Sequence, residues 1–241
     1  MSQFRLVLPC YNESNSLKQL AARAIGCAQK RGLSAADFTL VLVENGSADN
    51  SLSVMQALQK EPGGEFIRVV PITENRGYGF GVWSGLRAAA ELEGIIGWTH
   101  ADEQCDPEDA FRAWEILQNT KESTLIKGRR HGRLWKEQII TRGFEIAALF
   151  ILGKRITEIN AQPKVFHSEL VARLNNPPLD FSFDLYVLLE AMRANLKIKE
   201  IDVLFPPRKH GQSNWSATFR SKYRNISKAI KFMYSYRSSL R

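Results

Sequence analysis

The chain has 241 residues, of which 44% are hydrophobic and 24% charged, and its formal net charge is +8. This composition is ordinary for a globular protein with a sizeable buried core, and it excludes a disordered or low-complexity chain. The three cysteines, Cys10, Cys27 and Cys105, are widely spaced, which argues against a disulfide framework or a zinc cluster and predicts a reducing compartment.

The sequence predicts neither a leader peptide nor a membrane anchor. It runs at once into the β-rich stretch FRLVLP, without the charged start and long apolar core of a signal peptide. No uninterrupted apolar run approaches the roughly 20 residues that are needed to cross a bilayer. We therefore expect a cytoplasmic protein.

The first half of the chain alternates β-rich runs with helical stretches. Strands are predicted at residues 4–9, 38–44, 66–72, 94–100 and 123–128. Between them, helices are predicted from a cap at Ser14 or Asn15 to residue 30, and then at 50–60, 81–92 and 107–119. Nearly continuous apolar strands separated by such helices are typical of parallel strands covered on both faces. The predicted fold class is therefore α/β, with a doubly wound, mostly parallel sheet flanked by helices.

The second half of the chain is less regular. A strongly apolar helix is predicted at 137–153 and another helix at 182–194, with short strands at 163–166 and 198–205. No stretch rich in Gly, Ser or Pro separates two domains. We predict one domain at 1–215, followed by a basic amphipathic helix at 216–241.

The C-terminal helix combines positive charge with an apolar face. After Asp202 the sequence has nine Lys and Arg residues and no acidic residue. Apolar residues recur at spacings of four, three, four and three: Phe219, Tyr223, Ile226, Ile230 and Met233. A basic amphipathic helix with aromatic residues can bind an anionic membrane surface, but the pattern also fits a helix packed on its own domain. The apolar segment from Ile139 to Leu152 leaves the same two alternatives open, and the tail is the better candidate for the membrane contact.

Polar residues follow each of the first four predicted strands. They occur in the stretches CYNE, ENGSADN, NRGYGFG and HADEQCD. Because the carboxyl ends of parallel strands meet at one edge of a sheet, these residues are expected to line one crevice. Ordinary loops do not need polar groups at all four strand ends, so we predict a ligand site at this edge.

Eight sequence motifs resemble those of one enzyme family in order and approximate spacing. They are LPCYNE, VENGSADNS, NRGYGFGVWSGLRAA, HADEQCDPED, IKGRR, INAQPKVF, FSFDLYVLLEA and RKHGQSNW. On these motifs the chain resembles the family-2 glycosyltransferases of the GT-A fold, especially the polyprenyl-phosphate sugar synthases, over roughly Phe4 to Trp215. The resemblance implies a GT-A fold and an inverting enzyme that uses a nucleotide-sugar donor.

The resemblance also implies a divalent cation, Mg²⁺ or Mn²⁺, that neutralises the departing diphosphate. Where the family has Asp-x-Asp-x-Gln, this chain reads His100-Ala101-Asp102-Glu103-Gln104. The implied metal ligands are therefore Asp102 and Gln104, with His100 in place of the first acid, and Asp102 is also the first implied catalytic residue. Histidine ligates Mn²⁺ better than Mg²⁺; the alternative is a weakened or inactive site.

Other motif positions are implied to bind the nucleotide sugar. They are Pro9, Tyr11, Glu13, Glu44, Asp49, Gly77, Gly79, Arg129, Lys164, Arg208 and Ser213. Arginine forks suit phosphate oxygens, and Lys127 and Arg130 are further candidates beside Arg129. The glycines either let the backbone approach the donor or only shape their loop. Tyr11 either stacks on the base or only covers the sheet edge.

The acceptor decides whether a general base is needed. A sugar hydroxyl must lose a proton during attack, and the resemblance implies Asp184 as the second catalytic residue, at the position of the base in hydroxyl-acceptor relatives. Its alternative role is to supply negative charge at a helix N-terminus. A lipid phosphate, with a second pKa of about 6, is already mostly dianionic at pH 7 and needs less help.

The sequence therefore favours a metal-assisted, inverting glycosyltransferase. Its expected acceptor is a lipid of the polyprenyl-phosphate type, reached by peripheral contact with the inner, cytosolic face of a membrane. The alternatives are a hydroxyl-acceptor glycosyltransferase of polysaccharide or glycolipid synthesis and a catalytically silent nucleotide-sugar binding protein. Nucleic acid is not an expected partner because carboxylates line the predicted crevice, and the existence of a homo-oligomer stays open.

Overall fold

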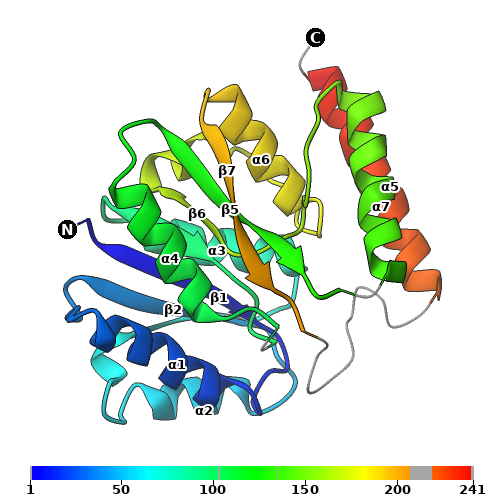
Figure 1. Ribbon diagram of the computed structural model, residues 1–241. Coiled ribbons are helices and arrows are strands. Elements are labelled where there is room, and N and C mark those ends of the chain that lie inside the picture. The colour runs from blue at the N-terminus through cyan, green and yellow to red at the C-terminus, as the bar shows by residue number, and fades with distance from the viewer. Residues whose placement is uncertain (1, 103, 134, 207–218, 240–241) are drawn as a thin grey trace.

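The computed structural model describes residues 2–102, 104–133, 135–206 and 219–239. A seven-stranded sheet forms the centre of the protein, and helices lie on both of its faces (Figure 1). The strands are β1 Phe4–Cys10, β2 Phe38–Asn45, β3 Ile67–Ile72, β4 Ile95–Trp98, β5 Thr124–His131, β6 Lys164–His167 and β7 Lys197–Leu204. The α-helices are α1 Leu17–Lys30, α2 Ser51–Leu58, α3 Tyr78–Ala89, α4 Pro107–Gln118, α5 Trp135–Leu152, α6 Phe183–Arg193 and α7 Phe219–Ser239. No helix in these ranges is both long and apolar enough to span a bilayer.

The strands follow the order β3-β2-β1-β4-β6-β5-β7. Neighbouring strands are parallel except around β6, which runs antiparallel to both β4 and β5. In register, Leu6 of β1 lies beside Leu40 of β2 and Gly97 of β4. The predicted α/β class with a mostly parallel sheet is confirmed, and the carboxyl ends of β1, β2 and β4 lie at one edge.

Apolar side chains of the strands form a core on each face of the sheet. Phe4 of β1 packs against Phe111 and Trp114 of α4, with ring centroids 5.3 and 5.7 Å apart. On the other face, Val7 lies against α3, where a Cβ at Gly85 would come within 2.3 Å of the Val7 side chain. The absence of a side chain at Gly85 therefore lets α3 lie close to the sheet.

Two predicted helix starts are wrong by a few residues. Helix α3 begins at Tyr78 rather than at Gly81, because Gly77 has a φ of 115° and its carbonyl accepts the first helical hydrogen bond from Gly81. Helix α1 begins at Leu17, with Ser16 rather than Ser14 or Asn15 as its N-cap. Both starts depend on contacts with loops from elsewhere in the chain.

Helix α7 packs against the rest of the protein. Figure 1 shows α5 and α7 side by side, and the two helices are in contact. On α7, Met233 is fully buried, and the Tyr236 hydroxyl donates to Glu190 Oε1 of α6 at 2.8 Å. Ile226 and Ile230 are half-buried. Much of the apolar face predicted on this helix is therefore covered by the protein itself.

Candidate active site

Hydrogen bonds join the loops that follow β1, β2 and β4. The backbone N–H of Asn12 donates to Ser47 Oγ at 3.1 Å, and that of Ala48 donates to Asn12 Oδ1 at 2.8 Å. Ser16 Oγ donates to the Ala101 carbonyl at 3.1 Å. Asn45 Nδ2 donates to the Gly77 carbonyl at 3.2 Å, so the structure brings all four predicted polar stretches together at the carboxyl edge of the sheet.

Asp102 lies in the turn after β4 and is half-buried rather than enclosed in the core. Its Oδ1 accepts a hydrogen bond from the backbone N–H of Gln104 at 3.2 Å. The side-chain amide of Gln104 donates to the Pro206 carbonyl at 2.8 Å, which ties the turn to the end of β7. The turn therefore holds the Asp102 carboxylate at the edge of the sheet, close to the loop after β1.

His100 stands beside an aromatic pair at the same edge. Its ring centroid is 5.8 Å from that of Tyr78, and Tyr78 stacks on Phe181 at 4.9 Å. The Tyr78 hydroxyl accepts from Trp98 Nε1 at 3.2 Å. Burial and the nearby Asp184 raise the pKa of Tyr78 well above its usual value, so its hydroxyl stays protonated. The sequence reasoning missed Tyr78, although it lies inside the NRGYGFG motif.

The donors at this edge suit a hard divalent cation. They are the Asp102 carboxylate and the Gln104 amide oxygen, beside the His100 imidazole, a nitrogen donor that suits Mn²⁺ better than Mg²⁺. Burial and the Asp102 charge raise the pKa of Cys105 to about 12, so no thiolate is available there as a soft ligand. Among the described residues, no three His, Cys, Asp or Glu side chains gather into a ready metal cluster. Mg²⁺ needs only one or two protein carboxylates when phosphates and waters supply the rest, so these residues fit such an ion beside a diphosphate.

Glu44 and Asp49, implied to bind the nucleotide, hold their own loop in shape. The buried Glu44 accepts from the backbone N–H of Ser47 at 2.5 Å. Asp49 accepts from Ser51 Oγ at 2.5 Å and from the backbone N–H of Ser14 at 3.1 Å. Partial burial raises the pKa of Asp49, but the hydrogen bonds from Ser51 and Ser14 outweigh it, so the pKa is lowered overall. Both carboxylates thus anchor the loop after β2, and the lowered pKa keeps that of Asp49 ionised.

The implied nucleotide contacts after β1 lie at the same edge. Pro9, Tyr11 and Glu13 are each half-buried. Glu13 Oε2 accepts from Ser16 Oγ at 3.0 Å, and the backbone N–H of Glu13 donates to Ser51 Oγ at 3.0 Å. Glu13 therefore links the loop after β1 to the start of α2. Stacking of a base on Tyr11 stays a prediction.

Gly77 and Gly79, at the start of α3, serve backbone packing. A Cβ at Gly77 would lie 2.3 Å from the Leu179 carbonyl oxygen, and one at Gly79 would lie 2.4 Å from the Pro178 carbonyl oxygen. The loop is further held by the Phe80 N–H, which donates to the Leu179 carbonyl at 3.2 Å. The sequence left two roles open for these glycines, close approach of the backbone to the donor or shaping of the loop. The contacts with Pro178 and Leu179 support the second role.

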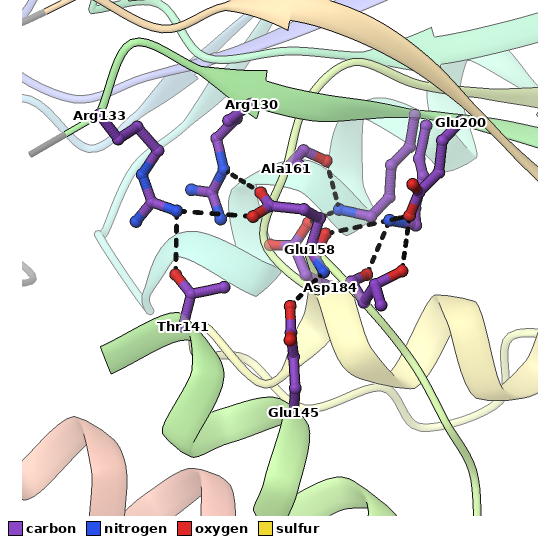
Figure 2. A network of polar contacts seen from close by, with 11 residues as sticks. Arg130, Arg133, Thr141, Glu145, Glu158, Ala161, Asp184 and Glu200 are labelled. Atoms are coloured by element: carbon purple, nitrogen blue, oxygen red, sulfur yellow. Dashed lines mark hydrogen bonds and ion pairs between the residues drawn. The ribbon is translucent and has the colours of Figure 1, made fainter. Parts of the chain in front are cut away.

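The arginines of β5 differ in exposure. The Arg129 side chain is 52% exposed and donates to Asp202 Oδ1 at 2.6 Å. Arg130 is enclosed and donates to Glu158 Oε2 at 2.7 Å, and Arg133 points to the same carboxylate (Figure 2). Arg129 is therefore the more accessible candidate for a phosphate contact. Arg130 holds the segment between α5 and β6.

Lys127 makes a buried ion pair with the neighbouring strand. Its Nζ donates to Glu200 Oε1 of β7 and to the Thr157 carbonyl, both at 2.7 Å. Burial lowers the pKa of Lys127, while the pair with Glu200 opposes that change. This lysine therefore stabilises the sheet edge and is not directed toward a ligand.

Lys164 and Asp184 form a second buried ion pair, in which neither side chain is more than 1% exposed. Asp184 Oδ1 also accepts from Gln162 Nε2 at 2.7 Å. Lys164 Nζ donates to the Ala161 carbonyl at 3.0 Å and lies 5.1 Å from the centre of the Trp98 ring. Burial lowers the pKa of Lys164 to about 8 even though Asp184 favours its charge. Either residue would have to leave this pair to act on donor or acceptor.

Gln162 is a functional candidate that the sequence reasoning missed. Its Nε2 donates both to the Tyr78 hydroxyl, at 3.2 Å, and to Asp184 Oδ1. Its Oε1 is buried and has no hydrogen-bond partner among the described residues, a state that native proteins seldom tolerate without a reason. The INAQPKVF motif contained this signal, but only Lys164 was taken from it. Gln162 connects the ion pair to the aromatic cluster beside His100.

Three sequence predictions concern residues outside the described part of the chain. They are the phosphate contacts at Arg208 and Ser213 and the domain boundary after residue 215. These stay predictions.

The sequence was compared with protein families and with curated proteins. The family described as "Glycosyl transferase family 2" matches residues 6–173. An undecaprenyl-phosphate 4-deoxy-4-formamido-L-arabinose transferase of Shewanella sediminis is 39% identical over 74 residues, which are 31% of this chain and 20% of that protein. A dolichyl-phosphate beta-glucosyltransferase of Mus musculus is 25% identical over 221 residues, which are 83% of this chain and 66% of that protein. The chain thus spans less than two thirds of the length of either relative.

Solved structures share the architecture. Glucosyl-3-phosphoglycerate synthase from Mycobacterium tuberculosis, crystallised with Mn²⁺, uridine diphosphate and phosphoglyceric acid, matches with a TM-score of 0.72 at 16% identity. The match covers 98% of this chain and 78% of that chain. The same enzyme has also been crystallised with Mg²⁺ and uridine diphosphate. At this level of identity the likeness shows a common fold.

Proposed function

The chain belongs to glycosyl transferase family 2, whose match covers most of it, and from this premise we propose that it transfers a sugar from a nucleotide-sugar donor to a polyprenyl-phosphate type of lipid. The family resemblance and the GT-A fold expected from the sequence are confirmed. The observation that carries the proposal is the position of Asp102, half-buried at the carboxyl edge of the sheet and beside the loop after β1.

On the donor side, Asp102 with Gln104 and His100 would hold Mg²⁺ or Mn²⁺. Such a cation, when bound, neutralises the charge that builds up on the leaving nucleoside diphosphate. The similar synthase that was crystallised with Mn²⁺ and uridine diphosphate supports this assignment. The loops after β1 and β2 would bind the nucleotide, and Arg129 is exposed enough to meet a phosphate oxygen.

On the acceptor side, the burial of Asp184 favours a phosphate nucleophile. A hydroxyl acceptor needs a base that touches it, whereas Asp184 is 1% exposed and paired with Lys164. A phosphomonoester is already mostly dianionic at neutral pH and needs no such base. The names of the relatives, which specify undecaprenyl phosphate and dolichyl phosphate, support the same acceptor class. A single displacement by this phosphate would invert the anomeric centre.

The acceptor lipid would place the reaction at a membrane surface. The protein would bind there peripherally, at the cytosolic face, where nucleotide sugars are available. The positive charge that accumulates after Asp202 supports attraction to anionic lipid.

The direct test uses the purified chain with labelled nucleotide sugars and two lipids of equal length, polyprenyl phosphate and the corresponding polyprenol. We expect Mn²⁺- or Mg²⁺-dependent label in polyprenyl phosphate alone, with inverted anomeric configuration by NMR. Transfer to the alcohol, or to a soluble glycan but not to the lipid phosphate, would refute the acceptor assignment. Transfer that persists in EDTA would refute the role of the cation.

A further inference from the structure

Helix α5 exposes a continuous apolar stripe. Its exposed large side chains are Trp135 at 65%, Ile139 at 58%, Ile146 at 54%, Leu149 at 45% and Phe150 at 78%. At 3.6 residues per turn these five positions fall within an arc of about 100°. The other position of α5 in that arc is Arg142, so the stripe contains one cation and no acidic residue.

The stripe is not the inner face of the helix. Ala148 of α5 is fully buried, and Phe144, Ala147 and Ile151 pack against the core that lies under α6 and α7. The helix therefore has two apolar faces, one of which the protein covers. A helix that is apolar on both sides normally has a second apolar environment.

Cations lie within the stripe and at its C-terminal end. Lys154 and Arg155 follow the last turn of α5 and are exposed, and neither they nor Arg142 makes an ion pair with any residue that the structure describes. On the neighbouring helix α7, Lys231 is exposed, and so is Tyr223, at 72%. Apolar side chains, aromatic rings and unneutralised cations on one surface match an anionic lipid interface.

The surface lies next to the candidate active site. The backbone N–H of Glu158 donates to Glu145 Oε1 of α5 at 2.7 Å, and Glu158 holds Arg130 of β5 (Figure 2). A recess lined by Phe144, from the inner face of α5, by Phe181 and by residues of α7 lies between α5 and this part of the site, and Phe181 stacks on Tyr78. A bilayer against α5 would therefore lie beside the end of the sheet where the lipid acceptor must react.

We propose that the outward face of α5, defined by Ile139, Ile146, Leu149 and Phe150 together with Arg142, is the surface by which this protein lies on an anionic membrane leaflet. The inference rests on the proposed function only for its biological purpose, because vesicle binding needs neither donor nor acceptor. It assigns the lipid contact to α5, with α7 supplying flanking charge.

The test compares Ile146→Glu and Phe150→Glu with the matched control Ile116→Glu. Ile116 is also an exposed isoleucine on a helix, at 41%, but it lies on α4. Binding of the full chain is measured by co-sedimentation with phosphatidylglycerol–phosphatidylcholine vesicles and with phosphatidylcholine vesicles, at low and high salt. We expect the α5 variants to lose about tenfold or more in partitioning because a charge replaces an inserted apolar group, and the control to stay within about twofold. Thermal unfolding should not differ among the variants.

Three outcomes would overturn the proposal. They are a failure of the wild-type chain to bind anionic vesicles, equal binding by Phe150→Glu, and sedimentation of the wild type as a dimer that Phe150→Glu dissociates. Transfer to a short-chain, water-soluble polyprenyl phosphate separates this proposal from the proposed function. If vesicle binding depends on α5 but no nucleotide sugar is ever used, the enzyme assignment fails while the membrane surface stands.

Discussion

Asp184→Asn tests whether the buried pair with Lys164 is structural or catalytic. The substitution preserves shape and leaves Asn Oδ1 able to accept hydrogen bonds, but it removes the charge that compensates Lys164, which is 0% exposed. Removing one partner of a buried ion pair costs about 3–5 kcal/mol. We expect the lower end, about 3 kcal/mol, because the hydrogen bonds can persist. At about 2–4 °C per kcal/mol for a domain of this size, the melting temperature should fall by about 6–12 °C at pH 7.

The pH dependence gives this prediction a second readout. Burial already lowers the pKa of Lys164 from 10.5 to about 8, and loss of the Asp184 charge would lower it further. Between the folded and unfolded pKa values the unfolded chain binds a proton that the folded chain does not, so stability rises with pH there. Because Lys164 has a lower folded-state pKa in the variant, the stability of the variant begins to rise at a lower pH than that of the wild type. Its deficit should therefore shrink as the pH is raised from 7 to 9.

Thermal unfolding by circular dichroism at pH 7 and pH 9 measures the loss of stability in Asp184→Asn. The single variant Lys164→Met and the double variant that combines both substitutions complete a double-mutant cycle. We expect the double variant to be more stable than Asp184→Asn alone. A variant Asp184→Asn that melts with the wild type but has lost all transfer would refute this reasoning. Asp184 would then be a base that reaches the acceptor, and a hydroxyl acceptor would be favoured.

Three further substitutions probe the edge of the sheet and its supports. Asp102→Asn should lower transfer about 100-fold or more, because it weakens the hold on the cation, and should leave the melting temperature within about 2 °C; a normal rate would exclude Asp102 from the site. Gly79→Ala should cost about 2 kcal/mol or more in unfolding free energy, since its Cβ would lie 2.4 Å from the Pro178 carbonyl, and a wild-type denaturant midpoint would contradict that contact. Asp106→Ala removes the cap that accepts from the Glu108 N–H at 3.0 Å, so it should cost about 1 kcal/mol; an unchanged midpoint would show that the cap is not needed.

The predicted elements that are correct depend on local signals. Asp106 and Pro107 place a capping carboxylate and a proline at the start of α4, and the helix begins there. The apolar strands of the first half are fixed by their composition and by the helices between them. The start of α3 was missed because it depends on Gly77, whose position is set by the Leu179 backbone far along the chain.

The burial and ion pairing of the candidate site residues could not be predicted from such local signals. Lys164 and Asp184 were interpreted separately, as a phosphate contact and as a base, because nothing local shows that β6 and α6 bring them into one pair. Arg129 and Arg130 are adjacent in sequence, yet only the fold places Glu158 next to Arg130. Burial is a property of the folded chain, and it decides which of these charges can reach a ligand.

The two amphipathic helices show the same limit. Residues 139–152 and the tail are both predicted as helices with an apolar face, and the sequence pattern favoured the tail as the membrane contact. In the structure Met233 of the tail is buried, whereas Phe150 of α5 is 78% exposed. A helical pattern shows that a face is apolar, but only packing shows whether the protein itself covers that face.

The most direct measurement is calorimetric titration of the wild-type chain and Asp102→Asn with a panel of nucleoside diphosphates, each with Mn²⁺ and with EDTA. Our account predicts that at least one nucleotide binds the wild type far more tightly with Mn²⁺ and that this dependence is lost in Asp102→Asn. Binding that is equally tight in EDTA, or that keeps its full Mn²⁺ dependence without the Asp102 carboxylate, would contradict the account.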